Sequence, residues 1–163
     1  MAPDRKDSMR GTIVCGFSDG DDGRAAFEAA AELSERLRLR LVLAHVADGI
    51  RVPEGDGADT ESGSVKANGA SAARLALELA SDHGLSDRTE HRSAVGDPAA
   101  LLAQIAAEEA ADLIVVGARM RGRLHRRLES RLAEQLETAT PVTVLIAAPR
   151  DRRRSLATNR GEH

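Results

Sequence analysis

The sequence predicts an α/β protein in which five parallel strands form one Rossmann-like, doubly wound sheet with helices on both faces. Short apolar runs alternate along the chain with segments whose apolar residues recur at helical spacing. Most of these runs lack polar alternation, which is typical of strands covered on both faces. Such alternation favours parallel pairing through right-handed crossovers and hence three layers. With 163 residues, 42% of them hydrophobic, the chain is long enough to bury one core.

Five segments carry the strand pattern: 12–17 (TIVCGF), 41–46 (LVLAHV), 88–95, 113–116 (LIVV) and 142–146 (VTVLI). The segment 88–95 alternates weakly, which favours a position near the edge of the sheet. Cys15 is the single cysteine and falls in the first strand, so we expect a buried, inert thiol. One cysteine excludes an intrachain disulfide and fits a reducing cytoplasm.

The first helix is expected to begin by Arg24, after a turn rich in Asp and Gly. The join that ends this helix, LRLR, has no glycine to adopt a left-handed cap, so we expect mild strain there, with Arg38 the candidate. The apolar residues at helical spacing that should face inward are Ala26, Ala30, Leu33 and Leu37.

Local signals also mark the later helices. A helix over 71–82 should end at His83-Gly84, and Gly96-Asp97-Pro98 predicts a helix with Asp97 as its N-cap and Pro98 in its first turn. A further helix should end before Pro141 and present an apolar stripe of four residues, Leu124, Leu128, Leu132 and Leu136.

One domain is expected over 11–148, between disordered tails at 1–10 and 149–163. The segment 48–69 is rich in Gly, Asp, Ser, Thr and Glu and has almost no core-forming residue. We therefore predict a flexible loop there, either disordered or a functional lid.

A strongly basic segment follows the fourth predicted strand. Six arginines and one glutamate between Arg119 and Arg131 give a formal charge of +5. Because ligands of open α/β sheets bind outside the carboxyl ends of the strands, this patch is a candidate site for an anionic ligand or a protein partner. Nucleic acid is an unlikely partner, since the whole chain carries a charge of −3 and only 1% aromatic residues. No apolar run is long enough to span a membrane.

The order of these segments resembles the universal stress protein family. The motifs that carry the resemblance are TIVCGFSDG, LVLAHV, GDPAALL, ADLIVVGA and LAEQLETATPVTVLI, and they cover about residues 11–148. The resemblance implies strand order 3-2-1-4-5, a homodimer formed by the last strands, and a role in stress survival or regulation without turnover. For one branch of the family it also implies ATP binding.

That branch has a phosphate loop of the form G-x2-G-x9-G-[S/T], in which glycines let backbone N–H groups reach the phosphates. Laid on this chain from Gly117, the remaining three positions fall on Met120, Ser130 and Arg131, and none matches. Gly122 lies two residues late. The resemblance therefore implies a degenerate loop, in which side chains occupy space that the ligand needs.

The other implied nucleotide contacts are partly kept. The adenine-contacting Asp falls on Ser18, with Asp19 one position along, and the Val that follows the histidine of the second strand is matched by Val46 after His45. The candidate cofactor-binding residues are Ser18, Asp19, Val46, Gly117, Arg119, Arg121, Gly122 and Ser130.

We therefore expect a non-catalytic, cytoplasmic protein of the universal stress protein type, acting as a homodimer through protein contacts without firm ATP binding. No cofactor is firmly expected. The alternative is an adenine-nucleotide sensor that holds ATP, with Mg²⁺, through an arginine-rich phosphate loop. We find no paired carboxylates, triad or metal-ligand cluster that would support an enzyme. Val142, Val144 and Ile146 alternate on the last strand and leave an apolar edge for the second copy.

Overall fold

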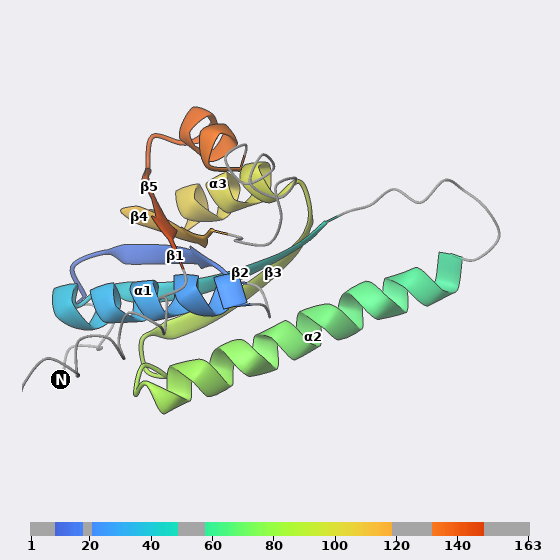
Figure 1. Cartoon of the computed structure of the whole chain (residues 1–163), viewed down its shortest axis with the longest axis horizontal. Helices are drawn as coiled ribbons and strands as arrows, with labels where there is room; N and C mark the ends of the chain where they lie inside the picture. Colours follow the sequence, from blue (N-terminus) through green and yellow to red (C-terminus); the bar gives the residue numbers. More distant parts are fainter. Residues whose placement is uncertain (1–8, 18–20, 49–57, 119–131, 149–163) are drawn as a thin grey trace, which may run out of the picture.

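The computed structural model describes residues 9–17, 21–48, 58–118 and 132–148 (Figure 1). In this part of the chain the strands form one parallel sheet with the order β3-β2-β1-β4-β5, as predicted. The strands are β1 (Thr12–Gly16), β2 (Arg40–Asp48), β3 (Thr89–Gly96), β4 (Leu113–Gly117) and β5 (Thr143–Ala147). The helices are α1 (Asp21–Leu37), α2 (Ala58–Asp82), α3 (Pro98–Glu108) and a further helical segment over 132–139.

Helices cover both faces of the sheet, which gives the three predicted layers (Figure 1). Helices α1 and α2 cover one face, here called the α2 face, and its core includes Phe27, Leu43 and Val115. Helix α3 and residues 132–139 cover the other, here called the α3 face, where Val14, Leu102 and Leu136 are buried. Successive residues of a strand point to opposite faces, so the apolar runs supply both cores at once.

The first strand carries Cys15 into the α2 face, where the side chain is fully buried. Burial raises the pKa of the Cys15 thiol to about 12, because a thiolate would lose its hydration there. The expectation of a buried thiol is therefore confirmed.

The loop predicted over 48–69 is wrong for residues 58–69, which are the beginning of α2. Figure 1 shows this part of α2 running beyond the sheet. A polar sequence without proline can continue a helix by backbone hydrogen bonds alone, and it then gives no periodic apolar signal. The inference of a loop from polarity failed for that reason.

Three helices end in the same way, with one residue in the left-handed region. Arg38 has φ 55°, as the missing glycine led us to expect, and Ala110 has φ 49°, while Gly84 has φ 67°. In each case the next residue donates its N–H to a carbonyl five positions back, and for Arg38 this bond joins Leu39 N to Ser34 O at 3.1 Å. This is the Schellman closure, which normally favours glycine at the left-handed position.

The G-D-P motif is confirmed in detail. The Asp97 side chain accepts a hydrogen bond from Ala100 N at 3.0 Å, and Pro98 occupies the first turn of α3. Gly96 has φ 146°, and a Cβ at this residue would lie 3.2 Å from Leu101 Cδ1. The glycine is needed because the chain turns there directly into a capped helix.

Other element predictions have mixed outcomes. Helix α1 begins at Asp21, which agrees with the expected start by Arg24. Leu37 is not in the core but 53% exposed, because α1 ends there and the chain turns away at Arg38. Leu132 and Leu136 do pack on the α3 face. Leu124, Leu128 and most of both tails lie outside the described residues.

None of the helices in the described ranges has a stretch apolar and long enough to cross a lipid bilayer.

Candidate functional site

The candidate site lies at the carboxyl edge of the sheet, where β1 and β4 are neighbours although α1, β2, α2, β3 and α3 separate them along the chain. The next described helices along the chain, α1 after β1 and residues 132–139 after β4, lie on opposite faces of the sheet. Such a switch point leaves a crevice outside the strand ends and is where open α/β sheets bind ligands. The sequence had placed its candidates after these same strands.

Two of the predicted site residues lie within the described part. Val46 is near the end of β2 and Gly117 is the last residue of β4, with β1 between the two strands. Gly117 is in register with Ala147 of β5, and the adjoining Ala118 N donates to Ala147 O at 2.8 Å. Val46 is half-buried and packs against the α3-face core. Both residues thus lie at the carboxyl edge of the sheet. Part of the Val46 side chain is buried in the α3-face core, so only the rest of it faces outward.

The remaining predicted residues lie outside the described residues. They are Ser18, Asp19, Arg119, Arg121, Gly122 and Ser130, together with the rest of the Arg119 to Arg131 patch. The hypothesis of an arginine-rich phosphate loop therefore stays a prediction.

Gly16, at the end of β1, has a packing role that the sequence reasoning missed. A Cβ at Gly16 would lie 3.2 Å from Val116 Cγ1 and 3.4 Å from Leu102 Cδ1. The contact with Val116 would force that side chain to shift, whereas the contact with Leu102 is an ordinary van der Waals distance. The glycine therefore leaves room for Val116 of the neighbouring strand β4.

The described residues offer few groups for catalysis. They include no group of three or more His, Cys, Asp or Glu side chains able to hold a metal ion. The one imidazole near the carboxyl edge is that of His45, one residue before Val46. Cys15 is buried and held in its neutral form, so its thiol does not act as a nucleophile.

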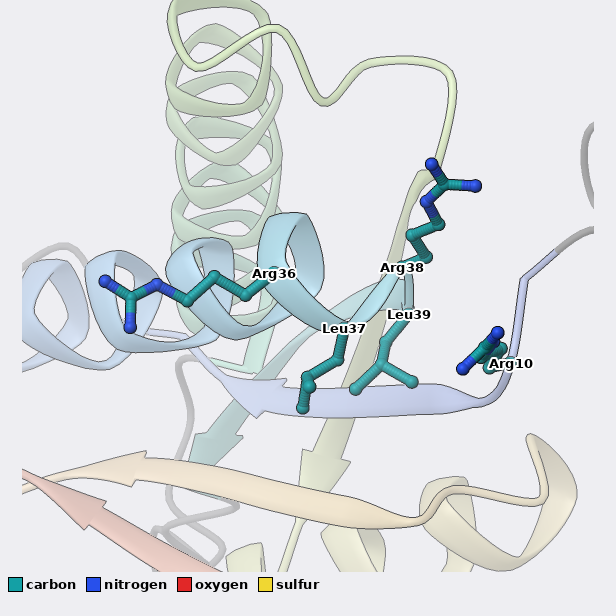
Figure 2. Close-up of a pocket in the computed structure, with 5 residues that line it drawn as sticks. All are labelled: Arg10, Arg36, Leu37, Arg38 and Leu39. Carbon is teal, nitrogen blue, oxygen red and sulfur yellow. The ribbon is translucent and has the colours of Figure 1, made fainter.

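A hollow of about 420 Å³ lies away from this edge, at the amino ends of β1 and β2, and Figure 2 shows the five residues that line it. Leu37 and Leu39 extend toward β1, while the guanidinium groups of Arg10, Arg36 and Arg38 point in different directions. Arg36 is also paired with Glu32 at 2.9 Å. Because these cations do not converge, the hollow lacks the geometry of a phosphate site.

An ion-pair network on the α3 face was also missed by the sequence reasoning. Arg40 of β2 bonds Glu90 of β3 at 3.0 Å and also pairs with Glu109, after α3. Arg92 of β3 bonds Glu109 at 3.2 Å and Glu108 at 2.6 Å. The spacing of Glu90 and Arg92 by two residues on a strand was the available signal, since it puts both on one face.

Comparison with known proteins agrees with this geometry. The sequence matches the universal stress protein family over residues 9–148. No curated protein matches it significantly.

The fold is similar to that of solved universal stress proteins. It resembles universal stress protein UspA from Lactobacillus plantarum with a TM-score of 0.70 and 17% identity, covering 86% of this chain and 99% of that one. A family member from Arabidopsis thaliana with AMP bound has a TM-score of 0.60 and 20% identity, over 88% of this chain and 94% of that one. The Archaeoglobus fulgidus protein in complex with dAMP has a TM-score of 0.59 and 17% identity, over 84% and 96%.

The family match spans the whole described sheet, and the strand order and the capped α3 are those that the motifs implied. The chain belongs to the universal stress protein family.

Proposed function

We propose that the protein is a non-catalytic stress-response or regulatory protein of the cytoplasm that acts as a homodimer through protein contacts, without firm ATP binding. The observation that carries the proposal is the exposed end of β5. This strand is at the edge of the sheet, and its Leu145 and Ile146 side chains are 39% and 52% exposed. An edge strand with exposed apolar side chains is a surface that a second copy can cover.

The edge differs in composition from the one proposed on sequence alone. Val142 and Val144 are half-buried against the α3-face core, so a partner would contact only part of these side chains. Ile146 remains available and Leu145 adds to it. Two such strands can pair about a twofold axis, because each presents the same residues to the other.

The absence of firm nucleotide binding is supported by the phosphate-loop positions. Met120, Ser130 and Arg131 occur where the nucleotide-binding branch has Gly, Gly and Ser or Thr. A side chain at a position where backbone must approach phosphate excludes the ligand sterically.

The experiment is sedimentation equilibrium at micromolar concentration on the wild type and on the Leu145→Lys/Ile146→Lys double variant. We expect the wild type to have twice the 17.3 kDa mass of one chain and the double variant to be monomeric. The matched control is Val95→Lys, because Val95 is 60% exposed on β3, the strand at the other edge of the sheet. This variant should stay dimeric. A monomeric wild type, or a dimeric double variant, would overturn the β5 dimer.

The second candidate function is an adenine-nucleotide sensor. Two observations favour it: Val46 and Gly117 lie at the expected edge, and similar structures are described as complexes with AMP, dAMP and cAMP. If arginines replace the loop glycines, calorimetric titration with AMP and with ATP should give a saturable isotherm. Heats that never rise above dilution at millimolar nucleotide would remove this candidate.

A further inference from the structure

A half-buried imidazole with one unpartnered ring nitrogen lies on the α2 face of the sheet. His91 of β3 is in register with Leu43 of β2, which is in register with Cys15 of β1, so the three side chains share one face. The Nε2 atom of His91 is enclosed and has no hydrogen-bond partner among the described residues. A buried polar atom that is not satisfied lowers the stability of the folded state.

A second imidazole lies beside it. His45 is two residues after Leu43 on β2, so it points to the same face, and it is in register with Ser93, two residues after His91. The two histidines are therefore diagonal neighbours on adjacent strands.

The cover of this face is a helix with an uncharged inner side. Helix α2 packs on β3 and β2. Ala72, Ala76 and Ala80 are buried, and Leu75 and Leu79 pack partly buried against the same core. The charged residues in the described side chains of α2 are exposed: Arg74, Glu78 and Asp82.

The other elements around His91 offer no anion either. The Cys15 thiol on β1 is neutral, because its pKa is about 12. On β3 the neighbours that share its face are Thr89 and Ser93, whereas Glu90 and Arg92 alternate to the α3 face, where both join the ion-pair network.

The charged side chains near the start of β3 and on α1 pair with other groups or are exposed to solvent. Arg88 donates to Ser34 O at 3.3 Å and is 3.9 Å from the carboxylate of Asp87. On α1, Glu32 pairs with Arg36, and the side chains of Glu28 and Glu35 are exposed. Among the described groups, His45 is the one whose charge acts on His91, and it repels a proton.

We propose that His91, with His45 beside it, makes the docking of α2 on the sheet dependent on pH, so that mild acid loosens α2 while α3 stays in place. Protonation gives His91 a second N–H and a positive charge beneath α2, whose described buried side chains are apolar and offer no acceptor for either. Opening of α2 admits water to the imidazolium and exposes the apolar α2 face. The chain thereby gains an acid-sensitive element that is independent of the β5 edge and of the crevice.

The direction of titration agrees with this geometry. Burial, and then the charge on His45, lower the pKa of His91 from its ordinary value of 6.5. A group with a lowered pKa binds fewer protons in the folded state than in the unfolded state, so stability falls as pH drops through 6.5 toward the folded pKa. The contribution is constant below both pKa values.

The experiment is amide hydrogen exchange on the full chain at pH 7.5 and pH 5.5, corrected for intrinsic rates. The ratio of open to closed α2 should rise over residues 70–82 on acidification, by up to about tenfold for each unit by which folding lowers the pKa of His91. Residues 98–108 of α3 should respond less. His91→Leu should abolish the response, since it removes the titrating group and keeps an apolar contact.

The matched control is His83→Gln. His83 is exposed near the end of α2; its Nδ1 is 2.9 Å from Leu79 O, and its ring lies edge-on to Phe27. This variant should keep the acid response of α2. Equal opening of α2 and α3 in acid, or an unchanged response in His91→Leu, would overturn the proposal. If His91→Leu does not fold, an NMR titration of the wild-type His91 ring decides, because a pKa at or above 6.5 contradicts it.

Discussion

The two faces of the sheet use different means to hold their helices. On the α2 face, α1 and α2 are held by apolar contact, with Phe27 fully buried and a row of buried alanines on the inner side of α2. On the α3 face, apolar contact is joined by the Asp97 cap, the turn at Gly96 and the network of Arg40, Glu109 and Arg92. Polar groups have partners on one face, while His91 on the other has an atom without one. Within one sheet, apolar packing alone can therefore hold the helices of one face, while polar pairing adds to it on the other.

The largest effect should come from the apolar face. Phe27 is fully buried, and Phe27→Ala should lower the free energy of unfolding by about 3–5 kcal/mol, because it removes transfer energy and leaves a cavity. Urea denaturation measures the loss. Phe27→Leu, which keeps most of the volume, should cost about 1.5 kcal/mol or less. Equal losses for the two variants would show that the volume filled by the Phe27 side chain does not determine the stability of this face.

A smaller effect is expected at the cap of the other face. Asp97→Ala removes the acceptor for Ala100 N and should lower the free energy of unfolding by about 1 kcal/mol. Asp97→Asn keeps an acceptor oxygen and serves as the control, with little change expected. If Asp97→Ala and Asp97→Asn lower the free energy of unfolding equally, the hydrogen bond of the cap does not stabilise this face.

The shared helix endings permit a stabilising test. Arg38 and Ala110 adopt positive φ without being glycine, so Arg38→Gly and Ala110→Gly should each raise the free energy of unfolding, by about 0.5–1 kcal/mol. Gly84→Ala should have the opposite sign. Urea midpoints at constant slope provide the measurement, and destabilisation by both glycine variants would contradict the Schellman interpretation.

The smallest effect concerns acid and the ion pair of Arg92 with Glu108. Hydrogen bonds from Gln104 and then from Arg92 hold the pKa of Glu108 below its ordinary value of 4.5. A lowered carboxyl pKa contributes stability that is present above 4.5 and is lost as pH falls through the folded pKa. The two faces should therefore lose stability in different pH ranges, from pH 6.5 downward for the α2 face and from pH 4.5 downward for the α3 face. Glu108→Gln should reduce the pH dependence of the free energy of unfolding below pH 4.5 and leave the dependence at higher pH unchanged. The effect should be small and reduced by salt, since the pair is exposed.

The sequence predicted what depends on burial and on local backbone chemistry. The apolar strands, the Asp97 cap and the strained Arg38 were all readable, because each leaves a pattern in adjacent residues. The first turns of α2 were not, since a polar helix that extends past the sheet has no periodic apolar stripe. Likewise, Leu37 followed the helical spacing but falls where α1 ends.

The candidate site was predictable only as a location. Val46 and Gly117 lie at the carboxyl edge of the sheet, because parallel strands bring their carboxyl ends together, and their role in binding stays a prediction. The isolated imidazole of His91 left no signal, since its neighbours His45 and α2 come from distant parts of the chain. Departures from a loop motif also do not reveal whether arginines can replace backbone contacts to phosphate.

The central claim, a family member that acts without firm nucleotide binding, is tested most directly by thermal unfolding with and without millimolar ATP and Mg²⁺. A ligand at 100 times its dissociation constant stabilises the folded state by about 2.7 kcal/mol, so binding would give a clear upward shift. The comparison uses Arg119→Ala/Arg121→Ala, with Arg10→Ala/Arg38→Ala as a control of equal charge change at the amino end of the sheet. We predict no shift in any of the three proteins. An upward shift that only the Arg119/Arg121 variant abolishes would contradict the account, because it would show that arginines have replaced the glycine loop.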